Sequence, residues 1–399
     1  MPTTGRSARL GYRPALDGIR AASIAAVLLY HGGFLSGGWL GVDIFFTLSG
    51  FLITSLLLQE WARAGRIMLR DFYGRRARRL LPALFLAIAL VGVEYVADPS
   101  LDTGLPYPVA AFSVIFYSGN WLEALLHRTD VLGLLDHTWS LAIEEQFYLV
   151  WPLALFFCLR RHLAARSLFV LALSLAVTSA VLRAALWHLG VSGVYYRTDA
   201  RADGLLIGCA AAALWSTARA RELMHRWTGL PVAIFGVAVV AVAALRLGTN
   251  GPSTYDGALF LVVLAAAVVI LHTLAHDGSV LTRGLKTRPA VWIGARSYGI
   301  YLYHIPIFKA VDVTAIKNVA RGWPAVATET ALTVAVAAAS YRWAEAPFLQ
   351  RRRLRGAPPH VQRARTGVPG PPSPLNAPRV TATASRRVCT PSARIRRRT

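Results

Sequence analysis

Charge and cysteine are scarce in this sequence, and each scarcity excludes a class of protein. Only 16% of the 399 residues are charged, 55% are hydrophobic and the mean hydropathy is +0.45, whereas soluble domains average about 25% charged residues. The cysteines, Cys158, Cys209 and Cys389, lie far apart and form neither a disulfide framework nor a zinc-type spacing. The composition therefore predicts a polytopic membrane protein.

Acidic residues are also few. The sequence contains 20 of them and 43 lysines and arginines, which gives a net charge of +23. Residues 350–399 contain 13 arginines and no acidic residue, mixed with proline, alanine, serine and threonine. Such a composition predicts a disordered tail, which at a membrane face would attract anionic lipid. No aromatic residue lies among these arginines for base stacking, so nucleic acid is not an expected partner.

Apolar runs approach the length of a membrane span, about 20 residues, at ten places. These are 15–35, 39–59, 80–97, 141–159, 167–187, 204–217, 230–247, 257–275, 290–309 and 324–346. The linkers richest in arginine and lysine then fall on one side with the amino terminus, as cytoplasmic loops do under the positive-inside rule. The sequence predicts an all-α polytopic membrane protein with about ten transmembrane helices and both termini in the cytoplasm.

Three segments follow from this pattern: a cytoplasmic segment at 1–12, a membrane domain at 13–349 and the basic tail at 350–399. The longest outer segment, 98–140, contains the apolar piece "VAAFSVIFYSGNWLEALL". This piece is too interrupted for a span and is expected to form a re-entrant or interfacial helix.

The first apolar run, "LDGIRAASIAAVLLYH", carries Asp17, Arg20 and His31. Eleven positions separate Arg20 from His31, which places both on one helical face about 16 Å apart, and Asp17 can pair with Arg20. Ionisable groups in a span usually face a bundle interior or a cavity. The alternatives are an Arg20 that snorkels to the interface and a His31 hydrogen-bonded to a neighbour.

The next run, "GGWLGVDIFFTLSGFLIT", sets Asp43 among glycines that permit close helix contacts. We expect Asp43 to orient a neighbouring group; the alternative is a broken helix end. The segment "RDFYGRRARRLLPAL" then places Arg75, Arg76 and Arg79 at the mouth of the third span. Such a cluster suits a phosphorylated ligand or, alternatively, a topology signal with lipid headgroups.

The most polar entry to a span is "DHTWSLAIEEQFYLVWPL", which contains His137, Ser140, Glu144 and Glu145. Ser140 and Glu144 share one helical face. Adjacent carboxylates point to different faces, so one of them is expected to enter the core. Alternatively, Glu145 lies at headgroup level within an aromatic belt.

Polar residues also interrupt the later spans. The segment "YYRTDARADGLLIG" carries four alternating charges, Arg197, Asp199, Arg201 and Asp203. They would form either a satisfied surface network or a binding site for a polar acceptor such as a sugar. His304 in "SYGIYLYHIPIF" and Glu345 in "SYRWAEAPF" are polar intrusions of the same kind.

In this order, over residues 12 to about 350, the segments resemble the acyltransferase 3 family of integral membrane acyltransferases. That family O-acylates cell-surface polysaccharides, peptidoglycan, lipopolysaccharide and some antibiotics. The motifs that carry the resemblance are Arg20 and His31 as the arginine-ten-residues-histidine motif, "GVDIFFTLSGFLIT", "FYGRRARRLLPA", "HTWSLAIEEQFYLVWPL", "YYRTDARADGLLIG", "SYGIYLYHIPIF" and "YRWAEAPF".

The resemblance implies an acyl-CoA donor used from the cytoplasmic side, no permanently bound cofactor or metal, and a carbohydrate hydroxyl as acceptor. It implies His31 as the base, Arg20 as the motif arginine and Glu144 as the motif acid, with Glu145 second. Candidates for the donor's phosphates are Arg75, Arg76 and Arg79. Candidate substrate contacts are Asp43, His137, Glu145, Asp199, Arg201, His304 and Glu345. The expected location is the bacterial cytoplasmic membrane, with the lipid bilayer as a partner.

The pattern is similar to a subgroup whose members often carry an extra span and an extracytoplasmic SGNH-type esterase domain. Only the basic tail follows the core here. A separate SGNH-type partner would therefore complete the transfer, or the core would modify its acceptor directly. Competing interpretations are acylation of a small-molecule glycoside or antibiotic, a transporter of a polar metabolite and a non-catalytic membrane partner. A transporter would be expected to contain inverted repeats, and no similarity between the two halves is visible.

Overall fold

The computed structural model describes residues 11–99, 104–126, 130–249, 251–313 and 322–348. The expected basic tail at 350–399 and most of the expected segment at 1–12 lie outside these ranges. The described residues form helices and turns without a strand, which agrees with the all-α prediction.

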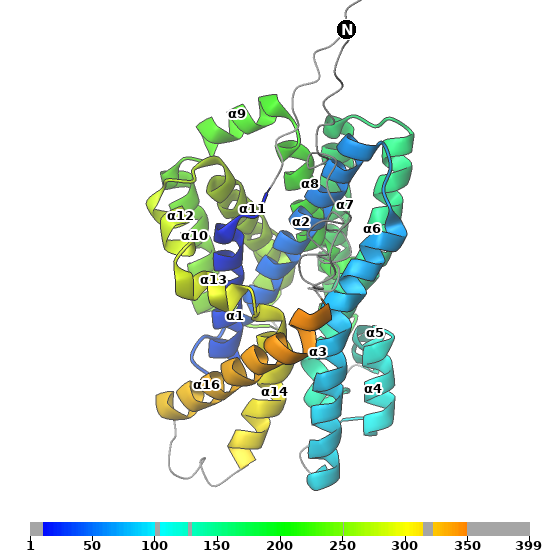
Figure 1. The fold of residues 1–399 in the computed structure, drawn as a ribbon, viewed down its shortest axis with the longest axis vertical. Helices are drawn as coiled ribbons and strands as arrows, with labels where there is room; N and C mark the ends of the chain where they lie inside the picture. Colours follow the sequence, from blue (N-terminus) through cyan, green and yellow to red (C-terminus); the bar gives the residue numbers. More distant parts are fainter. Residues whose placement is uncertain (1–10, 100–103, 127–129, 250, 314–321, 349–399) are drawn as a thin grey trace, which may run out of the picture. The chain divides into compact units, whose positions relative to one another are not determined.

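The elements follow one another along the chain as a series of long helices linked by short ones (Figure 1). They are α1 (Pro14–His31), η1 (Gly38–Leu40), α2 (Gly41–Ala64), α3 (Leu69–Ala97), α4 (Tyr107–Ile115), α5 (Gly119–Leu126), η3 (Gly133–Thr138), α6 (Trp139–Arg160), α7 (Ala165–His188), η4 (Val194–Tyr196), α8 (Thr198–Trp215), α9 (Ala218–Trp227), α10 (Leu230–Arg246), η5 (Thr254–Ala258), α11 (Leu259–Ala275), α12 (Val280–Leu285), α13 (Arg288–Gly294), α14 (Ser297–Val313), α16 (Trp323–Ser340) and η6 (Tyr341–Glu345).

Five helical stretches of the described chain are long and apolar enough to cross a bilayer. They are Gly38–Ala64, Leu69–Ala97, Gly133–Arg160, Ala165–His188 and Thr254–Ala275. A sixth results if α9 and α10, which meet at a bend of 76°, form one broken span. The expected number of about ten transmembrane helices is therefore not confirmed.

Two causes reduce the number of clear spans. Charged residues interrupt α1 at Asp17 and Arg20 and recur at the start of α8, and each charge lowers the apolar character of its helix. The run expected at 290–309 is divided between α13 and α14. The apolar piece within 98–140 forms two short helices, α4 and α5, which agrees with the expectation that it is no span.

Glycines bring α2 and α8 into backbone contact. A Cβ atom added at Gly50 would lie 1.9 Å from the carbonyl oxygen of Leu205, and one at Gly208 would lie 2.0 Å from that of Thr47. No side chain fits at such distances, so glycine is required where these helices meet. This contact fixes the position of Asp43 on α2 against the polar start of α8.

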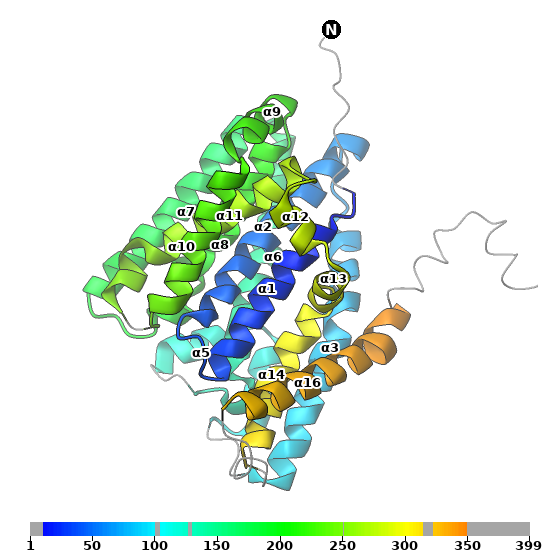
Figure 2. The same cartoon turned by 90° about the vertical axis from the view of Figure 1, so that its left-hand side faces the viewer.

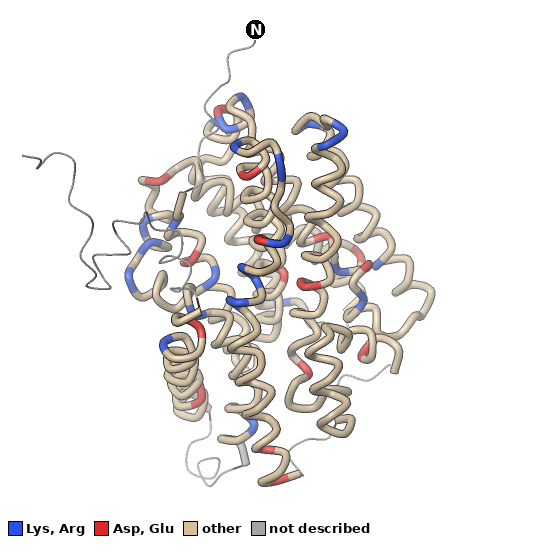
Figure 3. Tube along the Cα trace, turned by 45° about the vertical axis from the view of Figure 1, so that its right-hand side comes forward, with Lys and Arg blue, Asp and Glu red and all other residues tan. Residues whose placement is uncertain are grey.

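The helices in contact with α1 include α2, α12, α13 and α14, and Figure 2 shows α1 running beside α2 with α14 at its lower end. Basic residues are unevenly distributed along the tube in Figure 3. Lysine and arginine concentrate in its upper part, whereas its lowest part carries mainly acidic residues. The hydrophobic core includes Ile24, Phe51, Leu84, Ile143 and Leu302, each at most 1% exposed.

Candidate functional site

A cavity of about 300 Å³ lies between α1, α2, α3, α6 and α14. Its charged lining consists of Arg20 from α1, Arg76 and Arg79 from α3, and Glu144 and Glu145 from α6. Apolar side chains of α2, among them Phe45, Phe46, Leu52, Ile53 and Leu56, form another part of the wall. The fold thus brings five sequence-predicted site residues, from three separate motifs, to one cavity.

Arg76 occupies the centre of the charged wall. Its Nε donates to Oε1 of Glu145 at 2.8 Å, its Nη2 lies 3.6 Å from Oε1 of Glu144, and its guanidinium stacks 3.2 Å above the Tyr148 ring. Both carboxylates therefore face the cavity, and the expectation that they would separate is wrong. The reason is that neighbouring helix positions are only about 100° apart, so one guanidinium between them can contact both.

Glu144 has two further partners, both of which line the cavity. The hydroxyl groups of Ser49 and Tyr148 donate to its Oε1. The role of Tyr148 was missed from the sequence, although it lies four residues after Glu144, the spacing at which helical side chains meet. Ser49 lies 95 positions away in the chain, and no local pattern could have linked it to Glu144.

The three arginines differ in how they are neutralised. Arg20 pairs with Asp17, as the sequence predicts, and Arg76 pairs with the two glutamates. Within the described ranges, Arg79 has no ion-pair partner. Its guanidinium is therefore the one most available to an anionic ligand in this cavity.

Arg75 lies apart from this group. Its Nη2 is 3.6 Å from Oε2 of Glu60, its side chain is 40% exposed, and it does not line the cavity. Of these two adjacent arginines, Arg76 lines the cavity, whereas Arg75 is directed toward Glu60.

A second group joins three histidines predicted from separate motifs. Nδ1 of His31 lies 3.3 Å from Nε2 of His304, and the rings of His137 and His304 are 5.0 Å apart. His137 and His304 are 4% and 0% exposed, whereas His31 is exposed at the end of α1. Only His31 is thus open to a substrate.

Hydrogen bonds to carbonyl oxygens determine which ring nitrogen of each neutral histidine carries the proton, because a carbonyl can only accept. Nδ1 of His304 donates to the Tyr301 carbonyl at 2.6 Å, so its Nε2 has a lone pair. Nδ1 of His31 donates to the Val27 carbonyl at 3.0 Å and faces that lone pair. The remaining nitrogen of His31, Nε2, therefore carries a lone pair able to accept a proton.

Tyr301 connects the cavity to the histidines. Its side chain lines the cavity, its hydroxyl donates to the His137 carbonyl at 2.7 Å, and it lies 2.6 Å from Oγ of Ser140. Its own carbonyl accepts from His304. One turn of α14 therefore separates the arginine-lined cavity from the His31 group.

Asp43 and Arg201 form a buried ion pair between α2 and α8. Nη2 of Arg201 lies 3.0 Å from Oδ1 of Asp43, with side chains 0% and 2% exposed. The rings of Trp139 and Tyr195 approach the guanidinium at 5.5 and 4.7 Å. The pair confirms that Asp43 has a partner, and it holds α8 against α2.

A neighbouring pair was missed from the sequence. Nη1 of Arg183, on α7, lies 2.7 Å from Oδ2 of Asp203 and donates to the Ala200 carbonyl at 2.9 Å. An isolated arginine in the apolar sequence of α7 was the available signal, because such a charge inside a span requires a partner.

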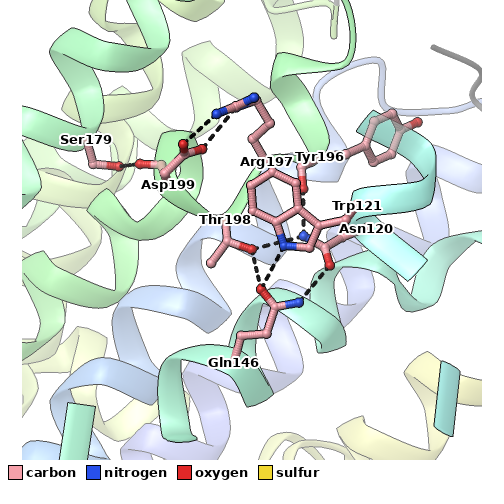
Figure 4. A network of polar contacts seen from close by, with 8 residues as sticks. All are labelled: Asn120, Trp121, Gln146, Ser179, Tyr196, Arg197, Thr198 and Asp199. Carbon is pink, nitrogen blue, oxygen red and sulfur yellow. Dashed lines mark hydrogen bonds and ion pairs between the residues drawn. The ribbon is translucent and has the colours of Figure 1, made fainter. Parts of the chain in front are cut away.

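Asp199 belongs to a separate polar network at the start of α8 (Figure 4). Its carboxylate accepts from Arg197 at 2.6 Å, and its backbone carbonyl accepts from Ser179 at 2.6 Å. Beside it, Thr198 donates to Oε1 of Gln146 at 2.6 Å. These contacts satisfy Asp199 locally and leave it outside the lining of the cavity.

Glu345 ends η6 and is 5% exposed. It does not line the cavity, but the positive charges of Arg79 and Arg296 act on its carboxylate. No group of three histidine, cysteine, aspartate or glutamate side chains suited to a metal ion occurs in the described part of the chain.

Comparisons with known proteins identify a family and several relatives. A family model described as an acyltransferase domain matches residues 13–342. Relatives include the peptidoglycan O-acetyltransferase OatA of Listeria monocytogenes, 36% identical over 354 residues, and the putative peptidoglycan O-acetyltransferase YrhL of Bacillus subtilis, 36% identical over 356 residues. The O-acetyltransferase OatA of Staphylococcus aureus is 33% identical over 349 residues.

Each of these matches covers 84% of this chain and 55–57% of the relative. The chain therefore spans a little more than half the length of the relatives that it matches. No solved structure matches it.

Proposed function

Because this chain belongs to the acyltransferase 3 family, we propose that it moves an acyl group, most simply acetyl, from acyl-CoA to a hydroxyl of a cell-wall or cell-surface carbohydrate. The observation that carries the proposal is the arginine-lined cavity separated from His31 by one turn of α14. The names of the relatives favour peptidoglycan as the acceptor. A small-molecule glycoside is the other acceptor that the chemistry allows.

The cavity is the proposed donor site. Acyl-CoA has phosphates at one end of a long arm and a thioester at the other, and guanidinium groups bind phosphate in a bidentate manner. In this arrangement Arg79 contacts a donor phosphate, Arg20 and Arg76 line the same wall, and the apolar side chains of α2 contact the arm. The thioester then lies toward His31.

His31 is the proposed general base. Its Nε2 takes the proton of the acceptor hydroxyl while the hydroxyl oxygen attacks the thioester carbonyl carbon. The carbon–sulfur bond then breaks, and the departing thiolate takes the proton from His31. His304 contributes by accepting from Nδ1 of His31, which favours the tautomer that leaves Nε2 free, and the ring of His137 packs against His304.

The orientation in the membrane is also a proposal. The basic end of the molecule in Figure 3 supports a cytoplasmic position for that end under the positive-inside rule. We place 1–12 and the tail 350–399 in the cytoplasm, 13–349 in the bacterial cytoplasmic membrane, and the acceptor outside it. An SGNH-type partner would complete the transfer wherever His31 cannot reach the final acceptor.

The decisive experiment measures alkali-released acetate from purified cell walls and envelope glycans of cells that express the chain. His31→Ala should abolish the increase while the protein still inserts. His188→Ala is the matched control, because His188 is exposed on α7 and, among the described residues, pairs only with Asp256. Unchanged acetate with His31→Ala would exclude the proposed base, and acetate confined to small glycosides would change the acceptor.

The donor site has a test that needs no acceptor. Arg79→Ala should weaken coenzyme A binding to the purified chain by about tenfold or more, since a charged hydrogen bond contributes about 1.5–3 kcal/mol. The loss should disappear when the ligand is pantetheine, which lacks the nucleotide phosphates. Arg75→Ala, which removes the same charge outside the cavity, should change neither affinity. Equal losses from both variants would contradict the assignment.

A further inference from the structure

Another cavity lies beside α9, away from the site above. It has a volume of about 680 Å³, in the range of small-molecule sites. Its lining comes from α9, the end of α8 and the end of α11: Trp215, Ala218, Arg221, Glu222, His225, Arg226, Leu274 and Ala275. None of these residues contributes to the proposed acyl transfer.

The helix α9 has the character of an interfacial helix. None of its residues is buried, and it meets α10 at 76°, so it lies across the ends of the long helices (Figure 1). Leu223 and Trp227, four positions apart on one face, are 46% and 68% exposed. Exposed leucine and tryptophan on a basic helix are typical of helices that lie in the plane of a membrane surface.

The cavity combines positive charge with an apolar wall. Arg221 and Arg226 supply two guanidinium groups, and neither has an ion-pair partner within the described ranges, although Glu222 also lines the cavity. Trp215 and Leu274 provide apolar surface beside them. An occupant that matches both features has an anionic phosphate next to hydrocarbon.

We propose that this cavity binds the headgroup of an anionic phospholipid. The phosphodiester contacts Arg221 and Arg226, and the acyl chains pass along Trp215 and Leu274 into the bilayer. Arginine suits this role because its planar fork pairs with two phosphate oxygens. A lipid fits better than free phosphate because a small inorganic anion would leave the apolar wall without a contact.

The test titrates phosphatidylglycerol onto the delipidated full-length chain and counts bound lipid by native mass spectrometry. Arg221→Ala combined with Arg226→Ala should lower the affinity at least tenfold. Arg219→Ala removes one charge from the same helix outside the cavity lining and is therefore the matched control for each single variant, Arg221→Ala and Arg226→Ala. An equal loss with Arg219→Ala would reduce the effect to general surface charge and overturn the proposal.

Two further arms distinguish the ligand sources. Phosphatidylcholine should bind more weakly than phosphatidylglycerol, and inorganic phosphate at equal concentration should not displace the lipid; displacement would assign the site to free phosphate instead. Hydrogen exchange is measured on the unmodified chain, so its result does not depend on whether an arginine variant folds. Amides of α9 should be protected in vesicles that contain phosphatidylglycerol and not in pure phosphatidylcholine, and equal protection in both would contradict the proposal.

Discussion

Replacing His304 by leucine removes the side-chain acceptor that faces Nδ1 of His31, and this tests the arrangement of the three histidines. Nδ1 of His31 has two acceptors, the Val27 carbonyl at 3.0 Å and Nε2 of His304 at 3.3 Å. The variant leaves only the carbonyl. His31 can therefore still accept a proton at Nε2, but it loses one of the two hydrogen bonds that fix its tautomer.

The size of the effect follows from that single contact. One hydrogen bond contributes about 0.5–1.5 kcal/mol, which corresponds to a two- to tenfold change in rate at about 1.36 kcal/mol per factor of ten. Loss of the general base in His31→Ala should cost about 10²–10⁴-fold. His304→Leu should thus lower kcat by about two- to tenfold and leave the KM for acyl-CoA unchanged, because His304 does not line the donor cavity.

The assay is the initial rate of acyl transfer by the purified chain in lipid nanodiscs over a range of acyl-CoA concentrations. Tyr303→Phe is the matched control, because Tyr303 is the neighbouring residue on α14 and is also 0% exposed. Its hydroxyl contacts Ala83 and Ser340 and is remote from the histidine bonds. This control should lose stability without a selective loss of kcat.

The double variant His31→Ala with His304→Leu tests whether His304 acts through His31. If His304 acts through His31, the second change should add nothing to the loss caused by the first. Independent effects, with the two losses multiplying, would show that His304 has a role of its own. A raised KM for acyl-CoA in His304→Leu would place His304 in the donor site and refute the reasoning.

Two stability predictions concern the contacts between α7, α8 and α2. Arg183→Met should lower the free energy of unfolding by about 3–5 kcal/mol, because it leaves the carboxylate of Asp203 buried and unpaired. Adding Asp203→Leu should recover most of that loss, and thermal unfolding measures both variants. Gly50→Ala should destabilise the protein by about 1–3 kcal/mol, because its Cβ would meet the Leu205 carbonyl oxygen. Gly248→Ala is the control and should leave the melting temperature unchanged, because there is open space around Gly248. Similar melting temperatures for both alanine variants would contradict the packing argument.

Local sequence patterns predicted the features that depend on one helix at a time. The apolar runs predicted an all-α protein, and the spacing of Asp17 and Arg20 predicted their pairing. Because they are polar residues in apolar surroundings, His31, His137 and His304 were each predicted to be site residues, one motif at a time. The expected number of about ten spans is not confirmed, and an apolar run by itself shows neither where a helix breaks nor whether it crosses a bilayer.

The sequence by itself determined which residues are too polar for lipid and must therefore meet partners. Where the partners lie on different helices, only the tertiary structure decided which residues they are. Arg76 meets Glu144 and Glu145, and His31 meets His304 from 273 positions away. The physical reason is that helix periodicity determines the face a side chain occupies but not which helix packs against that face. That choice depends on the fit of whole surfaces, as in the glycine contact between α2 and α8.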